Sequence, residues 1–238
     1  MTMYDRGVSA EARLRRWDGG MSWLAFPEET AARSSHAVRG ADGVWVLDPL
    51  DAGNVHDALA DLGPVAGVAV LSAYHARDAA AFADRYDVPV SLPRWLPRVE
   101  ARVDAPVERF DGELADTGFR VREYAPLPGW SEAIAYRRAD DTLYAPDTLG
   151  TAPPFTAGEE RLGLYLLQRL VAPKFFLGYD PERILVGHGE GVFENAAAAL
   201  EDAVANGMRR LPRALLENGP AQVRALVEAV DAGDLRGE

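Results

Sequence analysis

Three short apolar runs near the start of the chain are separated by two segments with helical periodicity, and this alternation limits the possible folds most strongly. The runs are residues 43–49 (GVWVLDP), 67–73 (GVAVLSA) and 88–92 (VPVSL). Apolar runs of this length, bounded by Gly, Pro or an acid, are typical of buried strands. Residues 54–62 and 76–86 lie between them and place apolar side chains on one helical face. The alternation predicts an α/β fold.

The remaining chain predicts a second set of strands and helices. A hairpin at residues 21–26 and 32–40 precedes the first apolar run. Strands at 107–110, 119–124, 132–136 and 142–145, with turns at 111–112, 128–129 and 140–141, predict an antiparallel meander. Further on we expect a helix at 159–171, a strand at 183–186, a helix at 192–206 ending at Gly207, and helical structure over 209–238 broken at 219–220.

Mixed sheets with helices after them predict a four-layer α/β/β/α sandwich. We expect residues 1–207 to form this domain and residues 208–238 to form a C-terminal helical extension packed on it.

The charge balance limits the class of partner. The chain has 37 acidic and 25 basic side chains, a formal net charge of -12, and a single lysine, Lys174. Nucleic acids and anionic membranes are bound through basic faces, so neither is expected as a partner. An acidic protein with almost no lysine is halophile-like, and a high-GC genome explains part of the same bias, so both explanations stay open.

The absence of cysteine limits the chemistry. Disulfides, thiolate zinc sites, iron–sulfur clusters and cysteine nucleophiles are all excluded, so any metal must be held by His, Asp or Glu. No apolar run reaches the ~18 residues that a membrane span needs, and residues 1–17 are charged without a signal-peptide stretch. We therefore expect a soluble cytoplasmic protein.

Polar segments follow the predicted strands at five places. They are Asp48, residues 72–78 (SAYHARD), residues 128–131 (PGWS), Asp147 and His188. In order and spacing they resemble the motifs of the metallo-β-lactamase-fold hydrolases, a superfamily that includes the glyoxalase II-like thioesterases. The phrases RYDVPVSLP, DTLYAPDTLG and ILVGHGE have close counterparts there, and the resemblance covers roughly residues 22–207. It implies the metallo-β-lactamase type of α/β/β/α sandwich.

The resemblance also implies a site for two metal ions, usually zinc, and here the sequence departs from the family. Three motif positions keep their residues, namely His75, Asp147 and His188. The first motif His is Ala73, the motif Asp is Arg77, the third motif His is Asp78, and the His after glycine is Trp130. A guanidinium cannot ligate a metal and repels one. A full dinuclear zinc centre is therefore not expected.

Two states of the site remain open. One divalent ion, zinc, iron or manganese, is held by His75, Asp78, Asp147 and His188, because imidazoles and carboxylates suit these ions. Alternatively the pocket is metal-free, and Arg77 pairs with Asp147 or Asp78 in place of the metal charge. In either state we expect four further residues to line the pocket, namely Asp48, Tyr74, Arg77 and Trp130.

These states lead to two functional hypotheses. A metal-free pocket favours a catalytically silent protein that binds a small-molecule ligand, and the missing ligands lead us to prefer this hypothesis. A single metal favours a hydrolase of an ester, thioester or phosphoester. The chain has no Gly-x-Ser-x-Gly elbow of a serine hydrolase.

Overall fold

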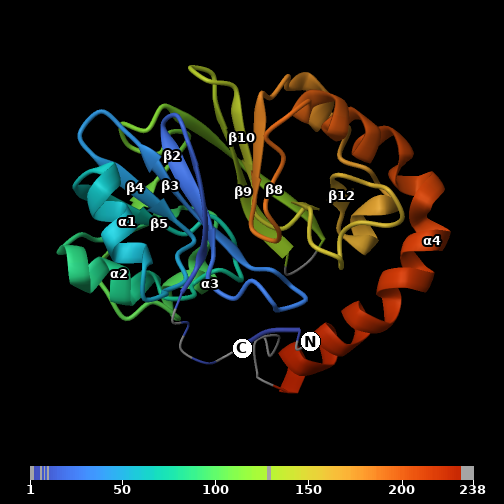
Figure 1. Ribbon diagram of the computed structural model, residues 1–238, viewed down its shortest axis with the longest axis horizontal. Helices are drawn as coiled ribbons and strands as arrows, with labels where there is room; N and C mark the ends of the chain where they lie inside the picture. The colour runs from blue at the N-terminus through green and yellow to red at the C-terminus, as the bar shows by residue number, and fades with distance from the viewer. Residues whose placement is uncertain (1–2, 6, 8, 10, 128–129, 232–238) are drawn as a thin grey trace.

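The computed structural model describes residues 3–5, 7, 9, 11–127 and 130–231, with side chains up to residue 219. The described residues form two large sheets that pack face to face (Figure 1). The first has seven strands in chain order, antiparallel from β1 to β4 and parallel from β4 to β7. They are β1 (Arg13–Trp17), β2 (Gly20–Leu24), β3 (Ser34–Arg39), β4 (Val44–Leu47), β5 (Val65–Ala69), β6 (Val90–Pro93) and β7 (Val107–Phe110).

The apolar runs of the sequence are central strands of this first sheet. Every residue of β4 is buried, because its side chains alternate between two faces and both faces are covered. Val44 and Val46 face the layer of α1 (Val55–Leu62) and α2 (Ala79–Tyr86). Trp45 and Leu47 face the second sheet. A short helix, α3 (Pro97–Glu100), lies between β6 and β7.

The second sheet has the order β13–β10–β9–β8. Its strands are β8 (Phe119–Leu127), β9 (Trp130–Arg137), β10 (Thr142–Ala145) and β13 (Arg183–Val186). The predicted meander therefore needs a correction, because β7 pairs in parallel with β6 in the first sheet. The predicted turn at residues 128–129 lies outside the described residues. A small third sheet pairs β11 (Leu149–Gly150) with β12 (Gly163–Leu164).

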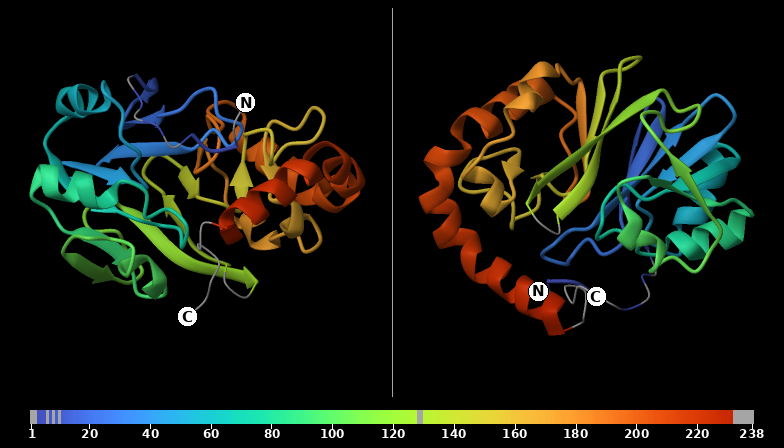
Figure 2. Two further views of the ribbon diagram at one scale, coloured as in Figure 1. Left: turned by 90° about the horizontal axis from the view of Figure 1, so that it is seen from below. Right: turned by 180° about the vertical axis from the view of Figure 1, so that it is seen from behind.

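A long helix, α4 (Ala196–Asp231), covers the outer face of the second sheet, opposite to α1 and α2 (Figures 1 and 2). Separate apolar clusters lie between the helices and each sheet and between the two sheets. This arrangement confirms the four-layer α/β/β/α sandwich.

Two helix predictions were wrong. The first concerns residues 159–171, which form no α-helix. Residues 159–171 form β12 and the 3₁₀ helix η1 (Leu166–Arg169), with a second 3₁₀ helix, η2 (Lys174–Gly178), after them. Arg169 is buried in an ion pair with Glu160 at 2.6 Å, and this tertiary contact overrides the local helical periodicity.

Gly207 does not end its helix, and α4 continues through residues 219–220. A Cβ on Gly207 would lie 2.8 Å from a methyl group of Leu164, so this glycine brings α4 close to β12. The division of the chain at residue 207 stays a prediction. None of the described helices is long and apolar enough to cross a membrane.

Candidate functional site

Asp48 stands directly after β4 and is fully buried. Its backbone has the left-handed φ of 48°, which Asp tolerates better than most residues. Its carboxylate accepts a hydrogen bond from the Leu71 amide at 2.7 Å and another from the Tyr144 hydroxyl. It also lies 3.0 Å from Nδ1 of His75. Asp48 therefore links β4, the end of β5 and the second sheet at the edge where the parallel strands end.

His75 and His188 present the same ring atom to one carboxylate. Nδ1 of His75 faces Asp48, and Nδ1 of His188 lies 2.9 Å from the Ala31 carbonyl oxygen. Their Nε2 atoms lie 3.0 Å and 3.3 Å from Oδ1 of Asp147. The two imidazoles and one carboxylate oxygen thus converge from three loops.

The glycines on either side of His188 allow this approach. A Cβ on Gly187 would lie 2.3 Å from the Pro146 carbonyl oxygen and 2.5 Å from Cε1 of His75. Gly189 has a φ of 103°, a conformation that side chains strongly disfavour.

Burial and charge set the protonation preferences of the site. Burial raises the pKa of Asp147, but the neighbouring His75 and His188 outweigh it and hold this pKa well below its usual range. Burial and Arg77 lower the pKa of His75, and the carboxylates of Asp147 and Asp48 outweigh them and raise it. The pKa of His188 is lowered, chiefly by burial. The site therefore favours an ionised Asp147 and one protonated imidazole.

Among the described residues, His75, Asp147 and His188 have ligand atoms within 4.8 Å of one another and could hold a metal ion. Metal-binding histidines commonly donate the other ring N–H to a carboxylate or a backbone carbonyl, and both imidazoles do so here. Asp78 lies elsewhere. It precedes α2, and its carboxylate accepts from the Asp51 amide at 2.8 Å. The structure therefore places three of the four predicted ligands together and directs the fourth to a loop amide.

Arg77 lies beside this group with a left-handed φ of 40°. Its guanidinium donates to the carbonyl oxygens of Ser34 at 2.6 Å, Asp48 at 2.9 Å and Gly187 at 3.1 Å, and it lies 3.1 Å from Nε2 of His75. Among the described ion pairs none joins Arg77 to Asp147 or Asp78, so the predicted pairing is replaced by bonds to backbone carbonyls. Arg77 thus places a fixed positive charge beside a candidate ligand atom.

Trp130 is the first residue of β9. Its ring contacts Tyr74, with centroids 6.2 Å apart, and Tyr165, with centroids 4.8 Å apart. Its indole N–H donates to Glu132 at 3.1 Å. That Trp130 lines the pocket stays a prediction.

The sequence analysis missed Glu132, a fully buried acid in β9. Its carboxylate accepts from the amides of Asp147 at 2.8 Å and Thr148 at 3.2 Å, and so holds the loop that carries the candidate ligand. Burial and the nearby Asp147 raise the pKa of Glu132 to about 7. A single acid beside the apolar sequence AIAY was the available signal.

Comparison with solved structures defines the class. The DIM-1 metallo-β-lactamase exposed to ceftazidime aligns over 85% of this chain and 99% of its own, with a TM-score of 0.60 and 11% identity. A metallo-β-lactamase from Hirschia baltica aligns over 79% and 97%, with a TM-score of 0.55 and 10% identity. The protein TTHA1623, solved in a di-iron-bound form, aligns over 72% and 93%, with a TM-score of 0.52 and 19% identity.

The chain therefore has the metallo-β-lactamase fold. No protein-family model matches its sequence. No curated protein matches it either. At 10–19% identity these likenesses concern the fold alone, and the chain is a divergent example of it.

Proposed function

We propose that this protein is not a dinuclear metallohydrolase, and that it binds a small molecule without catalysing its hydrolysis. The observation that carries the proposal is the position of the Arg77 guanidinium, which lies 3.1 Å from Nε2 of His75. A guanidinium stays protonated in proteins and cannot ligate a metal. It therefore lies beside a candidate ligand atom and adds positive charge where a metal would sit.

The charges of the site support the same proposal. The carboxylates of Asp48 and Asp147 are balanced by Arg77 together with one proton on His75. A divalent ion in place of that proton leaves the buried cluster with a surplus positive charge, which is costly away from water. A second divalent ion would increase the surplus, and Ala73 and Trp130 offer it no side-chain ligand.

A second candidate function rests on one separate observation. Both Nδ1 atoms are held by acceptors, so both Nε2 lone pairs can point at one ion beside Asp147. A bound divalent ion would supply a water of lowered pKa and polarise an ester, thioester or phosphoester carbonyl or phosphoryl group. In that case Glu132 would hold the backbone of Asp147 and Asp48 would orient His75.

Metal analysis of the purified protein tests the two functions against each other. After loading with zinc or manganese and removal of the excess, we expect far less than one metal ion per chain. A stoichiometric ion that is lost in His188→Ala and kept in His56→Ala would overturn the proposal in favour of the single-metal hydrolase. His56 is the matched control because it lies in α1 and pairs with Asp51 at 3.0 Å, away from the site.

The net charge of -12 supports a partner that is neither a nucleic acid nor an anionic membrane. We propose a small molecule instead, bound outside the histidine cluster.

A further inference from the structure

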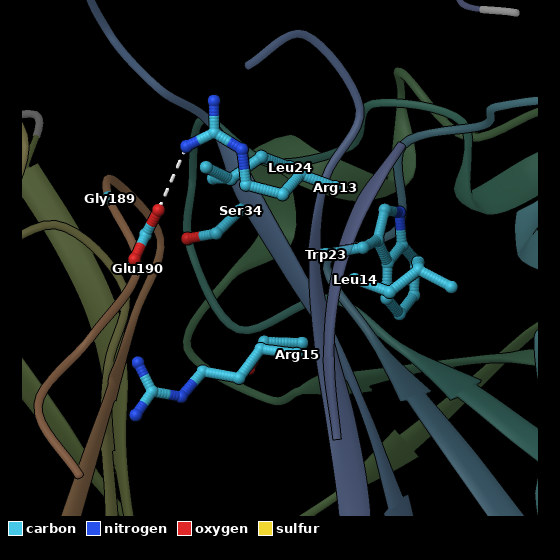
Figure 3. A pocket seen from close by; sticks show the side chains of 9 residues that line it. Arg13, Leu14, Arg15, Trp23, Leu24, Ser34, Gly189 and Glu190 are labelled. Atoms are coloured by element: carbon cyan, nitrogen blue, oxygen red, sulfur yellow. Dashed lines mark hydrogen bonds and ion pairs between the residues drawn. The ribbon is translucent and has the colours of Figure 1, made fainter. Parts of the chain in front are cut away.

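A cavity of about 240 Å³ lies between the first hairpin and the loop that follows β13. Arg13 and Arg15 of β1 reach toward the loop that carries Gly189 and Glu190 (Figure 3). Alternate residues of a strand point to the same face, so both guanidinium groups lie on one side of the hairpin. Leu14 between them packs into the core on the opposite face. The cavity therefore has a cationic wall in a protein of net charge -12.

The surroundings of the Arg15 guanidinium favour the binding of an anion. Its central carbon lies 3.9 Å from the centre of the Phe193 ring, so the aromatic ring covers one face of the group. Within the described part of the chain no carboxylate forms an ion pair with Arg15. The stacked face is desolvated while the N–H groups in the guanidinium plane stay free to bind a carboxylate with two parallel hydrogen bonds.

Two buried serines of the cavity present oxygen lone pairs rather than protons. Nε2 of His36 lies 2.8 Å from the Val186 carbonyl oxygen, which can only accept, so Nε2 carries the proton. Burial lowers the pKa of His36 to about 4, and the ring is therefore neutral near pH 7. Nδ1 then accepts from the Ser22 hydroxyl at 2.7 Å. The Ser34 hydroxyl donates to the Val186 carbonyl.

Glu190 adds a third acceptor at the opposite wall. Its carboxylate accepts from Arg13 at 2.9 Å, and about half of each of these side chains is exposed. Exposed ion pairs are weak, so a ligand can compete for either partner. The cavity thus combines two cationic donors with three oxygen acceptors within one small volume.

We propose that this cavity binds a small carboxylate that also carries a hydroxyl or ammonium donor. The carboxylate is held by Arg15 and Arg13, and the donor is accepted by Ser22, Ser34 or Glu190. A simple anion without a donor would leave the serine lone pairs facing negative charge, which is unfavourable. The volume limits the ligand to a molecule with a short carbon chain.

This inference rests on the proposed binding role and specifies its ligand. Different experiments test the metal-free state and the ligand site, so either can be refuted without the other. The metal test depends on His188, whereas ligand binding here depends on Arg15. A stoichiometric metal would overturn the metal-free state and leave an Arg15-dependent ligand site intact. Loss of the ligand site would leave the metal result unchanged.

Isothermal titration calorimetry of the full chain with propionate, lactate and free L-alanine tests the proposal, because these three-carbon carboxylates differ only in the donor. We expect lactate or alanine to bind at least about 10-fold more tightly than propionate, since one good hydrogen bond is worth about 1.4 kcal/mol, or tenfold. Tighter binding of lactate identifies a hydroxy acid, and tighter binding of alanine identifies an amino acid. Equal binding of all three, or no binding at millimolar concentrations, would overturn the proposal.

Arg15→Gln and its matched control, Arg16→Gln, locate the site. Arg16 is the next residue of β1, points to the other face and pairs with Asp61 at 3.2 Å, so both variants remove one exposed charge. We expect Arg15→Gln to weaken binding at least about 10-fold, as for loss of a charge-assisted bond, and Arg16→Gln to leave it within about 2-fold. An equal loss in both variants would mean general charge attraction and would contradict a site in this cavity.

Discussion

Replacement of Arg77 by methionine removes the cation of the candidate site and keeps most of its volume. The guanidinium donates three hydrogen bonds to backbone carbonyls and lies 3.1 Å from Nε2 of His75. It also balances the buried carboxylates of Asp48 and Asp147. Removing one partner of a buried charge cluster costs about 3–5 kcal/mol. This range already includes the loss of the hydrogen bonds that the partner makes.

Methionine at this position keeps the φ of 40°, so no backbone strain is relieved. In a chain of this length each kcal/mol lowers the melting temperature by about 2–4 °C, which gives an expected drop of about 6–20 °C. Differential scanning calorimetry and urea unfolding at pH 7 measure the change. Arg85→Met is the control, because Arg85 is exposed on α2 and its loss is expected to change stability by less than about 0.5 kcal/mol. A loss below about 1 kcal/mol in Arg77→Met would refute the charge-balance argument.

The same position tests the exclusion of metal. Arg77→Asp replaces the cation by a third carboxylate, so the site becomes anionic and gains a ligand. We expect zinc to raise the melting temperature of this variant, because an ion at 100 times its Kd stabilises by about 2.7 kcal/mol. Arg77→Met should respond less than Arg77→Asp, because it removes the opposing cation without adding a ligand, and wild type should not respond. An equal rise in wild type would show that Arg77 does not oppose the metal.

Three further substitutions test individual contacts of the site and of the fold. Glu132→Gln removes a carboxylate that accepts from the loop of the candidate ligand and should cost about 1–3 kcal/mol in urea unfolding at pH 7. Although partial burial raises it, the hydrogen bonds and charge of Arg137 hold the pKa of Asp140 below its ordinary value. Asp140 therefore adds stability above its unfolded pKa that is lost as the pH falls through its folded pKa. Asp140→Asn should be about 1–3 kcal/mol less stable than wild type at pH 7, with the difference vanishing in acid; a constant difference would refute this assignment. Gly189→Ala, where a Cβ would meet a hydroxyl oxygen at 2.2 Å with φ at 103°, should lower the melting temperature clearly, whereas Gly178→Ala, with nothing within 4 Å, should not.

Local sequence patterns predicted those strands of the sandwich that are buried on both faces. GVWVL and GVAVL could be recognised because both faces of a central strand must be apolar. The sheet to which β7 belongs could not be recognised, because its four residues carry no signal about their partner. Residues 159–171 have helical periodicity, but Arg169 and Glu160 form a buried pair that only the tertiary fold brings together.

The site was predictable to the extent that its residues follow strands. His75, Asp147 and His188 converge because they stand at the same edge of two facing sheets. Asp78 does not join them, because it stands at the start of α2, where its carboxylate takes a loop amide. Glu132 lies inside a strand rather than after one, so a search of strand ends passes over it.

The retained histidines and acids are not evidence for a metal, because each has a structural role without one. Asp48 joins the amide of Leu71 in the first sheet to the hydroxyl of Tyr144 in the second. Asp147 accepts from the Ser72 hydroxyl and so joins the same two sheets. His188 donates to the Ala31 carbonyl. Substitution of these residues would therefore weaken the fold whether or not an ion binds. Arg77 separates the two explanations, because its cation supports the metal-free cluster and opposes the metal-bound one.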